Sequence, residues 1–214
     1  MRFRKILVVA KPTPPDMGAL HAAARLASAA GAGLVTLDPT GNGVPAVEIA
    51  RAAEREAADL IIIEREPLEV VEGAVRRARV PCLVVPREEP TFRRILAAVD
   101  GGPDSAEILS LAAAIGELFG GDVTSVHVEP CAPVQSATRS WAWGADRAAV
   151  ATAGTLLVRS GDPVAEIVKL VHEEGIDLLV HGHHRCGPAN GHETGSVAAR
   201  LLRRAPCAVL TVPI

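Results

Sequence analysis

Aromatic residues are almost absent from this sequence: Phe, Trp and Tyr together make up 2% of it, and Tyr does not occur. Basic residues are not in excess either, since the formal net charge is −3 at pH 7. Proteins that bind nucleic acids in basic grooves need clustered Lys and Arg, and many add aromatic side chains on which the bases stack. The composition therefore argues against a nucleic-acid-binding protein of that kind.

Cysteines and long apolar runs are also scarce. The chain has four cysteines without paired spacing, and Cys82 and Cys207 each follow a proline at the start of an apolar run, as buried strand residues do. This usage favours a reducing, cytoplasmic setting. The first apolar run, residues 6–10, is too short for the core of a signal peptide or for a membrane span. We therefore expect a soluble cytoplasmic protein that does not associate with membranes.

What the sequence has instead is an alternation of short apolar runs and amphipathic segments. Hydrophobic residues make up 49% and charged residues 22%, which suits a packed core. The runs are rich in β-branched residues, so the pattern predicts an α/β fold with a parallel sheet covered on both faces. The expected strands are residues 5–10, 33–37, 59–63, 81–85, 94–99, 123–128, 155–159, 177–181 and 207–212, and the expected helices are 16–30, 45–57, 67–78, 103–119, 163–174 and 196–204.

The chain contains an internal repeat. Residues 3–10 recur at 92–99, residues 45–62 recur at 163–180, and the start of segment 81–86 recurs at 206. The offset grows from 89 to 118 to 125 residues, so the second copy is longer in two places. We interpret the chain as two tandem α/β domains, residues 1–88 and 92–214, joined by the polar segment 87–91.

The end of the second copy has the form of a phosphate site. An apolar strand over 176–180 is followed by a loop that starts at Gly182, and Gly195-Ser196 opens the last helix. A glycine lets a phosphate approach the backbone, and the first N–H groups of a helix are unpaired and carry partial positive charge. The alternative is an ordinary strand–loop–helix joint in which Ser196 is the N-cap.

At these residues the sequence resembles the universal stress protein family, whose signature is Gly-x2-Gly-x9-Gly-Ser between a strand and the last helix. The spacing is kept here, but Arg185 stands at the second glycine, and the resemblance continues through 196–213 and covers 93–214. It implies two tandem Rossmann-like domains of the adenine-nucleotide alpha-hydrolase-like type, packed as a pseudo-dimer through segments 82–85 and 207–212. It also implies a stress-response regulator that binds ATP or another adenine nucleotide, with or without Mg, and does not turn it over. Whether the whole chain forms a homodimer is left open.

The resemblance also implies which residues hold the nucleotide. Ligands of open α/β sheets bind beyond the carboxyl ends of the strands, and the family's strand order places Asp100 near Gly182. Asp100 and the backbone of Val128 would face adenine and ribose, and Gly182, Gly195, Ser196 and Val197 would hold the phosphates. Each has an alternative explanation, since Asp100-Gly-Gly-Pro is a good turn and helix start and Val128 suits any buried strand.

The first copy lacks the counterparts of these residues. Only residues 64–67 join its corresponding strand and helix, Lys11 stands where the second copy has Asp100, and no Gly-Ser opens the helix after Pro67. We therefore predict that the first domain is degenerate and has no nucleotide loop. Its expected role is to pack against the second domain.

Arg185 supports two opposite hypotheses. A side chain at this position blocks the close approach that glycine allows, which would remove the phosphate site. A guanidinium group is also a strong bidentate partner of phosphate and could replace the lost backbone contact. Segment 130–154, which contains Trp141 and Trp143, is either a lid over the crevice or a loop.

Other functions fit the sequence less well. His181, His183, His184, Cys186 and His192 could be zinc ligands, but their spacing matches no zinc-finger pattern, so we predict no metal site. Residues 100–105 resemble the pyrophosphate loop of N-type ATP pyrophosphatases, although an Asp replaces the first Ser. No nucleophile–base pair is visible elsewhere, and we predict no enzyme. The main alternative is a ligand-free interaction module that kept the fold and lost the site.

Overall fold

The predicted strands and helices are confirmed to within two residues at each end. The structure, a computed structural model, describes residues 3–10, 17–39, 44–65, 67–87, 89–129, 155–183 and 196–214. The first half comprises β1 (Lys5–Val9), α1 (Gly18–Ala30), β2 (Gly33–Leu37), α2 (Ala46–Arg55), β3 (Leu60–Glu64), α3 (Leu68–Arg77) and β4 (Cys82–Val85). The second comprises β5 (Arg94–Ala98), α4 (Ser105–Phe119), β6 (Asp122–Glu129), β7 (Thr155–Ser160), α6 (Pro163–Glu173), β8 (Leu178–His183), α7 (Ser196–Arg204) and β9 (Ala208–Pro213).

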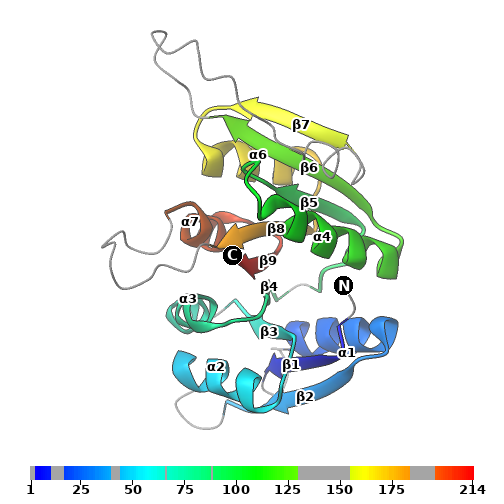
Figure 1. Cartoon of the computed structure of the whole chain (residues 1–214), viewed down its shortest axis with the longest axis vertical. Helices are drawn as coiled ribbons and strands as arrows, with labels where there is room; N and C mark the ends of the chain where they lie inside the picture. Colours follow the sequence, from blue (N-terminus) through cyan, green and yellow to red (C-terminus); the bar gives the residue numbers. More distant parts are fainter. Residues whose placement is uncertain are drawn as a thin grey trace.

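The described strands form one sheet, in the order β2-β1-β3-β4-β9-β8-β5-β6-β7 (Figure 1). Neighbouring strands are parallel except for β4 and β9, which pair antiparallel with Leu83 opposite Leu210. The expected pairing of the two last strands is therefore confirmed, and within each half the sheet is parallel as expected. Pairing protects the two strand edges that would otherwise be open to other chains.

Helices cover both faces of the sheet. α1 and α4 lie on one face, and α2, α3, α6 and α7 lie on the other; Figure 1 shows α1 on the right and α2, α3 and α7 on the left. Side chains alternate between the faces along each strand, so Ile6 and Val8 pack toward α1 while Leu7 and Val9 pack toward α2. Among the described residues no helix is long and apolar enough to cross a membrane.

In each half an aspartate side chain accepts two backbone hydrogen bonds at the start of the first strand. The carboxylate of Asp59 accepts the backbone N–H groups of Arg4 (2.8 Å) and Lys5 (3.2 Å). The carboxylate of Asp177 accepts those of Arg93 (2.9 Å) and Arg94 (3.3 Å) in the same way. These partners are related by the offsets of the sequence repeat, so the repeat has a physical counterpart in the structure.

Polar contacts join the two halves beside the β4–β9 joint. The guanidinium of Arg65, in the short β3–α3 connection, donates to the backbone carbonyls of Ala205 and Cys207, between α7 and β9. On the same face Arg203 forms a bidentate ion pair with Glu72 of α3, with N–O distances of 2.5 and 2.8 Å. Arg65 and Glu72 thus attach the first half to the second.

Candidate functional site

A cavity of about 260 Å³ lies at the carboxyl ends of β5, β6 and β8, where an open α/β sheet binds its ligands. It is lined mostly by apolar side chains. The lining residues are Ala98, Val99, Asp100, Ile108, Val126, Val128, Pro163, Ile167, His181, Gly182, Val197, Leu201 and Ile214. The structure therefore brings four of the six predicted site residues to one cavity.

Asp100 follows β5 and lines the cavity while it also organises the turn into α4. Its Oδ1 accepts the backbone N–H of Gly102 (2.8 Å) and the hydroxyl of Ser105 (3.4 Å), and α4 begins at Ser105. Gly101 has a φ of +78°, a conformation that favours glycine. The turn explanation of Asp100 is thus confirmed, and the residue also lines the cavity. Its contact with a ligand stays a prediction.

Gly182 lies in β8 opposite Val212 of β9. A Cβ atom added to Gly182 would lie 2.6 Å from Cδ1 of Ile214 and 3.0 Å from Cδ1 of Ile108, closer than carbon atoms approach without contact strain. The packing of these two isoleucines accounts for the glycine in the structure as it stands. The same packing opposes the predicted role of Gly182, which is to let a phosphate approach the backbone.

Val128 and Val197 line the cavity from β6 and α7. Val128 is half-buried in β6, and Val197, in the first turn of α7, is 36% exposed. The N-terminal turn of α7 therefore lies at the cavity and places the partial positive charge of the helix N-terminus there. α7 begins at Ser196, whose side chain, like Gly195 and Arg185, lies outside the described residues.

His181 is a cavity residue that the sequence suggested only as a member of a histidine cluster. It is 3% exposed, its Nδ1 lies 3.0 Å from the carbonyl oxygen of Gly182, and its Nε2 lies 3.4 Å from Oγ1 of Thr211. Because a carbonyl only accepts, Nδ1 carries the proton and donates it. Burial is the main reason why the pKa of His181 is lowered to about 4. The nearby His183 lowers this pKa further, and the hydrogen bond to Gly182 raises it. His181 is therefore neutral at physiological pH.

Of the proposed zinc-binding cluster, the structure describes His181 and His183 on β8; His184, Cys186 and His192 lie outside the described residues. Within the part that is described, no group of three or more His, Cys, Asp or Glu side chains is placed to hold a metal ion.

In the wall formed by α6 and α7 only Val197 was predicted as part of the site, and Pro163, Ile167 and Leu201 were not. Asp162 caps α6 by accepting the N–H of Ala165 (2.9 Å), and its two oxygens also pair with the guanidinium of Arg200 on α7 at 3.0–3.2 Å. The Ala165 hydrogen bond, followed by the one from Arg200, lowers the pKa of Asp162. The Asp162-Pro163 pair signals a helix start in the sequence, but it does not show that the helix borders a cavity.

Comparison with known proteins supports the resemblance found in the sequence. Residues 91–213 match the universal stress protein family. The chain belongs to this family. A universal stress protein from Methanothermobacter thermautotrophicus (strain Delta H) is 38% identical over 53 residues, which are 25% of this chain and 36% of that protein. The match thus spans about a third of that relative's length.

Solved structures of similar fold extend the likeness to nearly the whole chain. A candidate universal stress protein from Pseudomonas aeruginosa UCBPP-PA14 superimposes with a TM-score of 0.79 at 21% identity, over 99% of this chain and 93% of that one. A universal stress protein from Archaeoglobus fulgidus DSM 4304 gives a TM-score of 0.61 at 22% identity, over 91% of this chain and 76% of that one. At these identities the likeness shows a shared fold.

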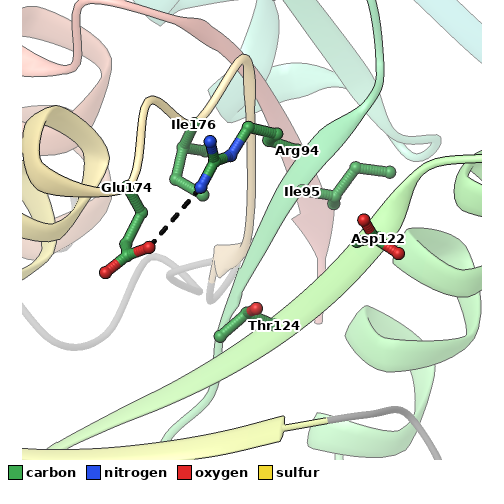
Figure 2. A pocket seen from close by; sticks show the side chains of 6 residues that line it. All are labelled: Arg94, Ile95, Asp122, Thr124, Glu174 and Ile176. Carbon is green, nitrogen blue, oxygen red and sulfur yellow. Dashed lines mark ion pairs between the residues drawn. The ribbon is translucent and has the colours of Figure 1, made fainter.

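This universal stress protein domain also has a polar cavity of about 380 Å³ at the opposite, amino end of its strands (Figure 2). Figure 2 shows Arg94 and Glu174 paired across it, with an N–O distance of 3.5 Å. In the first half Lys5 and Glu56 form the equivalent pair at 3.7 Å. Because the pair recurs in both halves, we interpret it as part of the structural repeat and not as a ligand site.

Proposed function

We propose that residues 92–214 bind ATP or another adenine nucleotide in the cavity at the carboxyl ends of β5, β6 and β8, and that the protein is a stress-response regulator that does not turn the nucleotide over. The observation that carries this proposal is the convergence of Asp100, Val128, Gly182 and Val197 on one cavity. They come from four segments that are far apart in the sequence, and the resemblance to the family implies a ligand contact for each of them.

The chemistry of the lining suits the two ends of a nucleoside. The apolar walls from β6, α6 and α7 can bury an aromatic base, whose transfer out of water is favourable. The carboxylate of Asp100 can accept hydrogen bonds from ribose hydroxyl groups, a role that acidic residues take in other nucleotide-binding α/β folds. The N-terminal turn of α7, at Val197, supplies partial positive charge toward a phosphate.

We propose further that the chain is a tandem pair in which the first half, residues 1–88, is a degenerate packing partner. By the offset of the repeat, Glu64 stands at the position of Gly182, and β3 and α3 are joined only by residues 65–67. The guanidinium of Arg65 is bonded to the carbonyls of Ala205 and Cys207 in the second half. These contacts, with the β4–β9 pairing, support an internal pseudo-dimer.

One alternative has an observation of its own. The side chains of Ile108 and Ile214 fill the space beside Gly182, and Asp100 already serves the turn into α4 through its Oδ1. Both facts favour a ligand-free interaction module that kept the fold and lost the site.

Calorimetric titration of the purified protein with ATP, ADP and AMP separates the two functions. We expect binding of at least one nucleotide, weakened by Asp100→Asn, which keeps the acceptor for Gly102 and removes the negative charge. Asp104→Asn, four residues on and outside the cavity lining, is the matched control and should bind as the parent does. No heat up to millimolar nucleotide would favour the interaction module.

Two further experiments address Arg185 and turnover. If Arg185 removes the phosphate site, Arg185→Gly should tighten ATP binding more than tenfold, about 1.4 kcal/mol. If Arg185 grips the phosphate, the same change should weaken binding. Recovery of unchanged ATP after long incubation with Mg²⁺ is the expected result, and the appearance of AMP and pyrophosphate would make the protein an enzyme.

A further inference from the structure

The space beside the backbone of Gly182, on the α4 face of the sheet, is occupied by Ile214. Its Cδ1 would lie 2.6 Å from a Cβ atom built at Gly182. The isoleucine therefore takes the space that a side chain at position 182 would need. Carbon atoms in ordinary contact are about 3.5–4.0 Å apart. A phosphate oxygen cannot reach the same side of Gly182 while this methyl group stays in place.

The strand geometry explains why Ile214 points there. Its backbone N–H donates to the carbonyl of His183 (3.0 Å), which continues the β8–β9 ladder by one residue beyond β9. Side chains of alternate residues share a face, so Ile214 follows Leu210 and Val212 onto the α4 face and packs against the same core. The backbone hydrogen bond to His183 thus fixes the position of Ile214 and directs its side chain to this face.

Ile214 is the neighbour of Gly182 that can move. Ile108, the other neighbour, is 3% exposed within α4 and is fixed by the core. Ile214 is only half-buried and lies past the end of its strand, so rotation of its side chain disturbs fewer contacts. Of the two side chains that crowd Gly182, Ile214 is therefore the one whose movement can change access to its backbone.

We infer that Ile214 determines which adenine ligands the cavity accepts. This inference rests on the proposed function. With Ile214 in place, the apolar walls and Asp100 hold the base and ribose, and the phosphate chain is kept from Gly182. The wild-type protein should then gain little affinity from added phosphates, and a smaller residue at position 214 should favour ATP over adenosine.

The test compares ATP with adenosine by calorimetry in the wild-type protein, Ile214→Ala and Ile214→Val. Ile214→Val removes only the Cδ1 methyl that faces Gly182, so it probes the contact with the least risk to folding. We expect Ile214→Ala to tighten ATP binding about tenfold while adenosine affinity changes less than threefold, with Ile214→Val between the two. Ile176→Ala, at the opposite end of the domain beside the cavity of Figure 2, should leave the ratio of the two affinities unchanged.

The possible failures are distinct. Absence of binding by either ligand to any of the variants would overturn the proposed function and this inference with it. Binding of both ligands with an ATP-to-adenosine ratio that Ile214→Ala does not change would overturn the inference alone. A loss of affinity for both ligands in Ile214→Ala would also overturn it, because Ile214 would then be a contact for the base.

Thermal unfolding checks the contact without any ligand. Gly182→Ala should lower the unfolding midpoint by about 2–4 °C, as crowding at Ile214 and Ile108 predicts for a chain of this size. The same substitution should cost less in the Ile214→Val background, since the closest methyl group is gone. An equal cost in both backgrounds would show that Ile214 does not crowd Gly182 and would overturn the inference.

Discussion

Ala57 and Gly175 adopt the same left-handed backbone conformation, with φ values of +50° and +57°, 118 residues apart in the chain. Each ends the turn that leads from a helix into a strand, α2 into β3 and α6 into β8. The second half has glycine at this position, where glycine is favoured, and the first half has alanine. The two halves therefore share a backbone path but not the residue best suited to it.

Replacing Ala57 by Gly should stabilise the protein by up to about 1 kcal/mol, because an alanine pays a steric cost in this conformation that exceeds the entropy cost of the glycine. Gly175→Ala should destabilise it by a similar amount. Urea unfolding measures both. Ala24→Gly, at an exposed position inside α1, is the control and should destabilise by about 1 kcal/mol. Destabilisation by Ala57→Gly would contradict the prediction.

Arg65 should be the polar contact between the halves whose loss costs most. Arg65→Met keeps the apolar stem but removes the donors to the carbonyls of Ala205 and Cys207, and unsatisfied carbonyls in a partly buried site cost about 1–3 kcal/mol. Urea unfolding of Arg65→Met should show this loss as a single transition. Arg51→Met, in which an exposed ion pair to Glu48 is lost, should change stability by less than about 0.5 kcal/mol.

The thiols of Cys82 and Cys207 should resist alkylation in the folded protein. Burial raises the pKa of Cys82 to about 12 and that of Cys207 to about 11, so neither is a thiolate at pH 8. In a variant with Cys131→Ser and Cys186→Ser, iodoacetamide should label neither thiol of the native protein and both after denaturation. Rapid labelling of the native variant at pH 8 would show that one of these strands opens.

His181 should contribute to acid sensitivity. It takes up a proton near its ordinary pKa of 6.5 in the unfolded chain but only near pH 4 in the folded protein. Its contribution to stability is thus complete above pH 6.5 and is lost as the pH falls toward 4, about 2 kcal/mol of it by pH 5. His181→Asn, which retains a donor toward Gly182, should remove this part of the pH dependence.

Urea unfolding at pH 7 and pH 5 tests the role of His181. The difference between the two pH values should be smaller in His181→Asn than in the wild type. His172→Asn, on the exposed side of α6, should behave as the wild type does. Equal pH dependence in all three proteins would place the acid sensitivity at other groups.

Much of the fold was predictable because its signals are local. The apolar runs predicted the described strands and the amphipathic segments predicted the helices, since each pattern reflects the repeat distance of its own element. The internal repeat was visible for the same reason: Asp59 and Asp177 precede equivalent strands and make equivalent hydrogen bonds. The turn after β5 could likewise be predicted from Asp100 and the two glycines that follow it.

The sequence by itself determined the α/β order of elements, the repeat and the family, and it placed Asp100, Val128, Gly182 and Val197 at the carboxyl ends of strands or the start of a helix. Only the tertiary structure decided what surrounds them. It joined the halves through β4 and β9, brought His181 and the α6–α7 wall to the cavity, and set Ile214 against Gly182. These neighbours lie far apart in the sequence. They meet because side chains from several elements pack closely together, and the local periodicity of the sequence carries no information about such contacts.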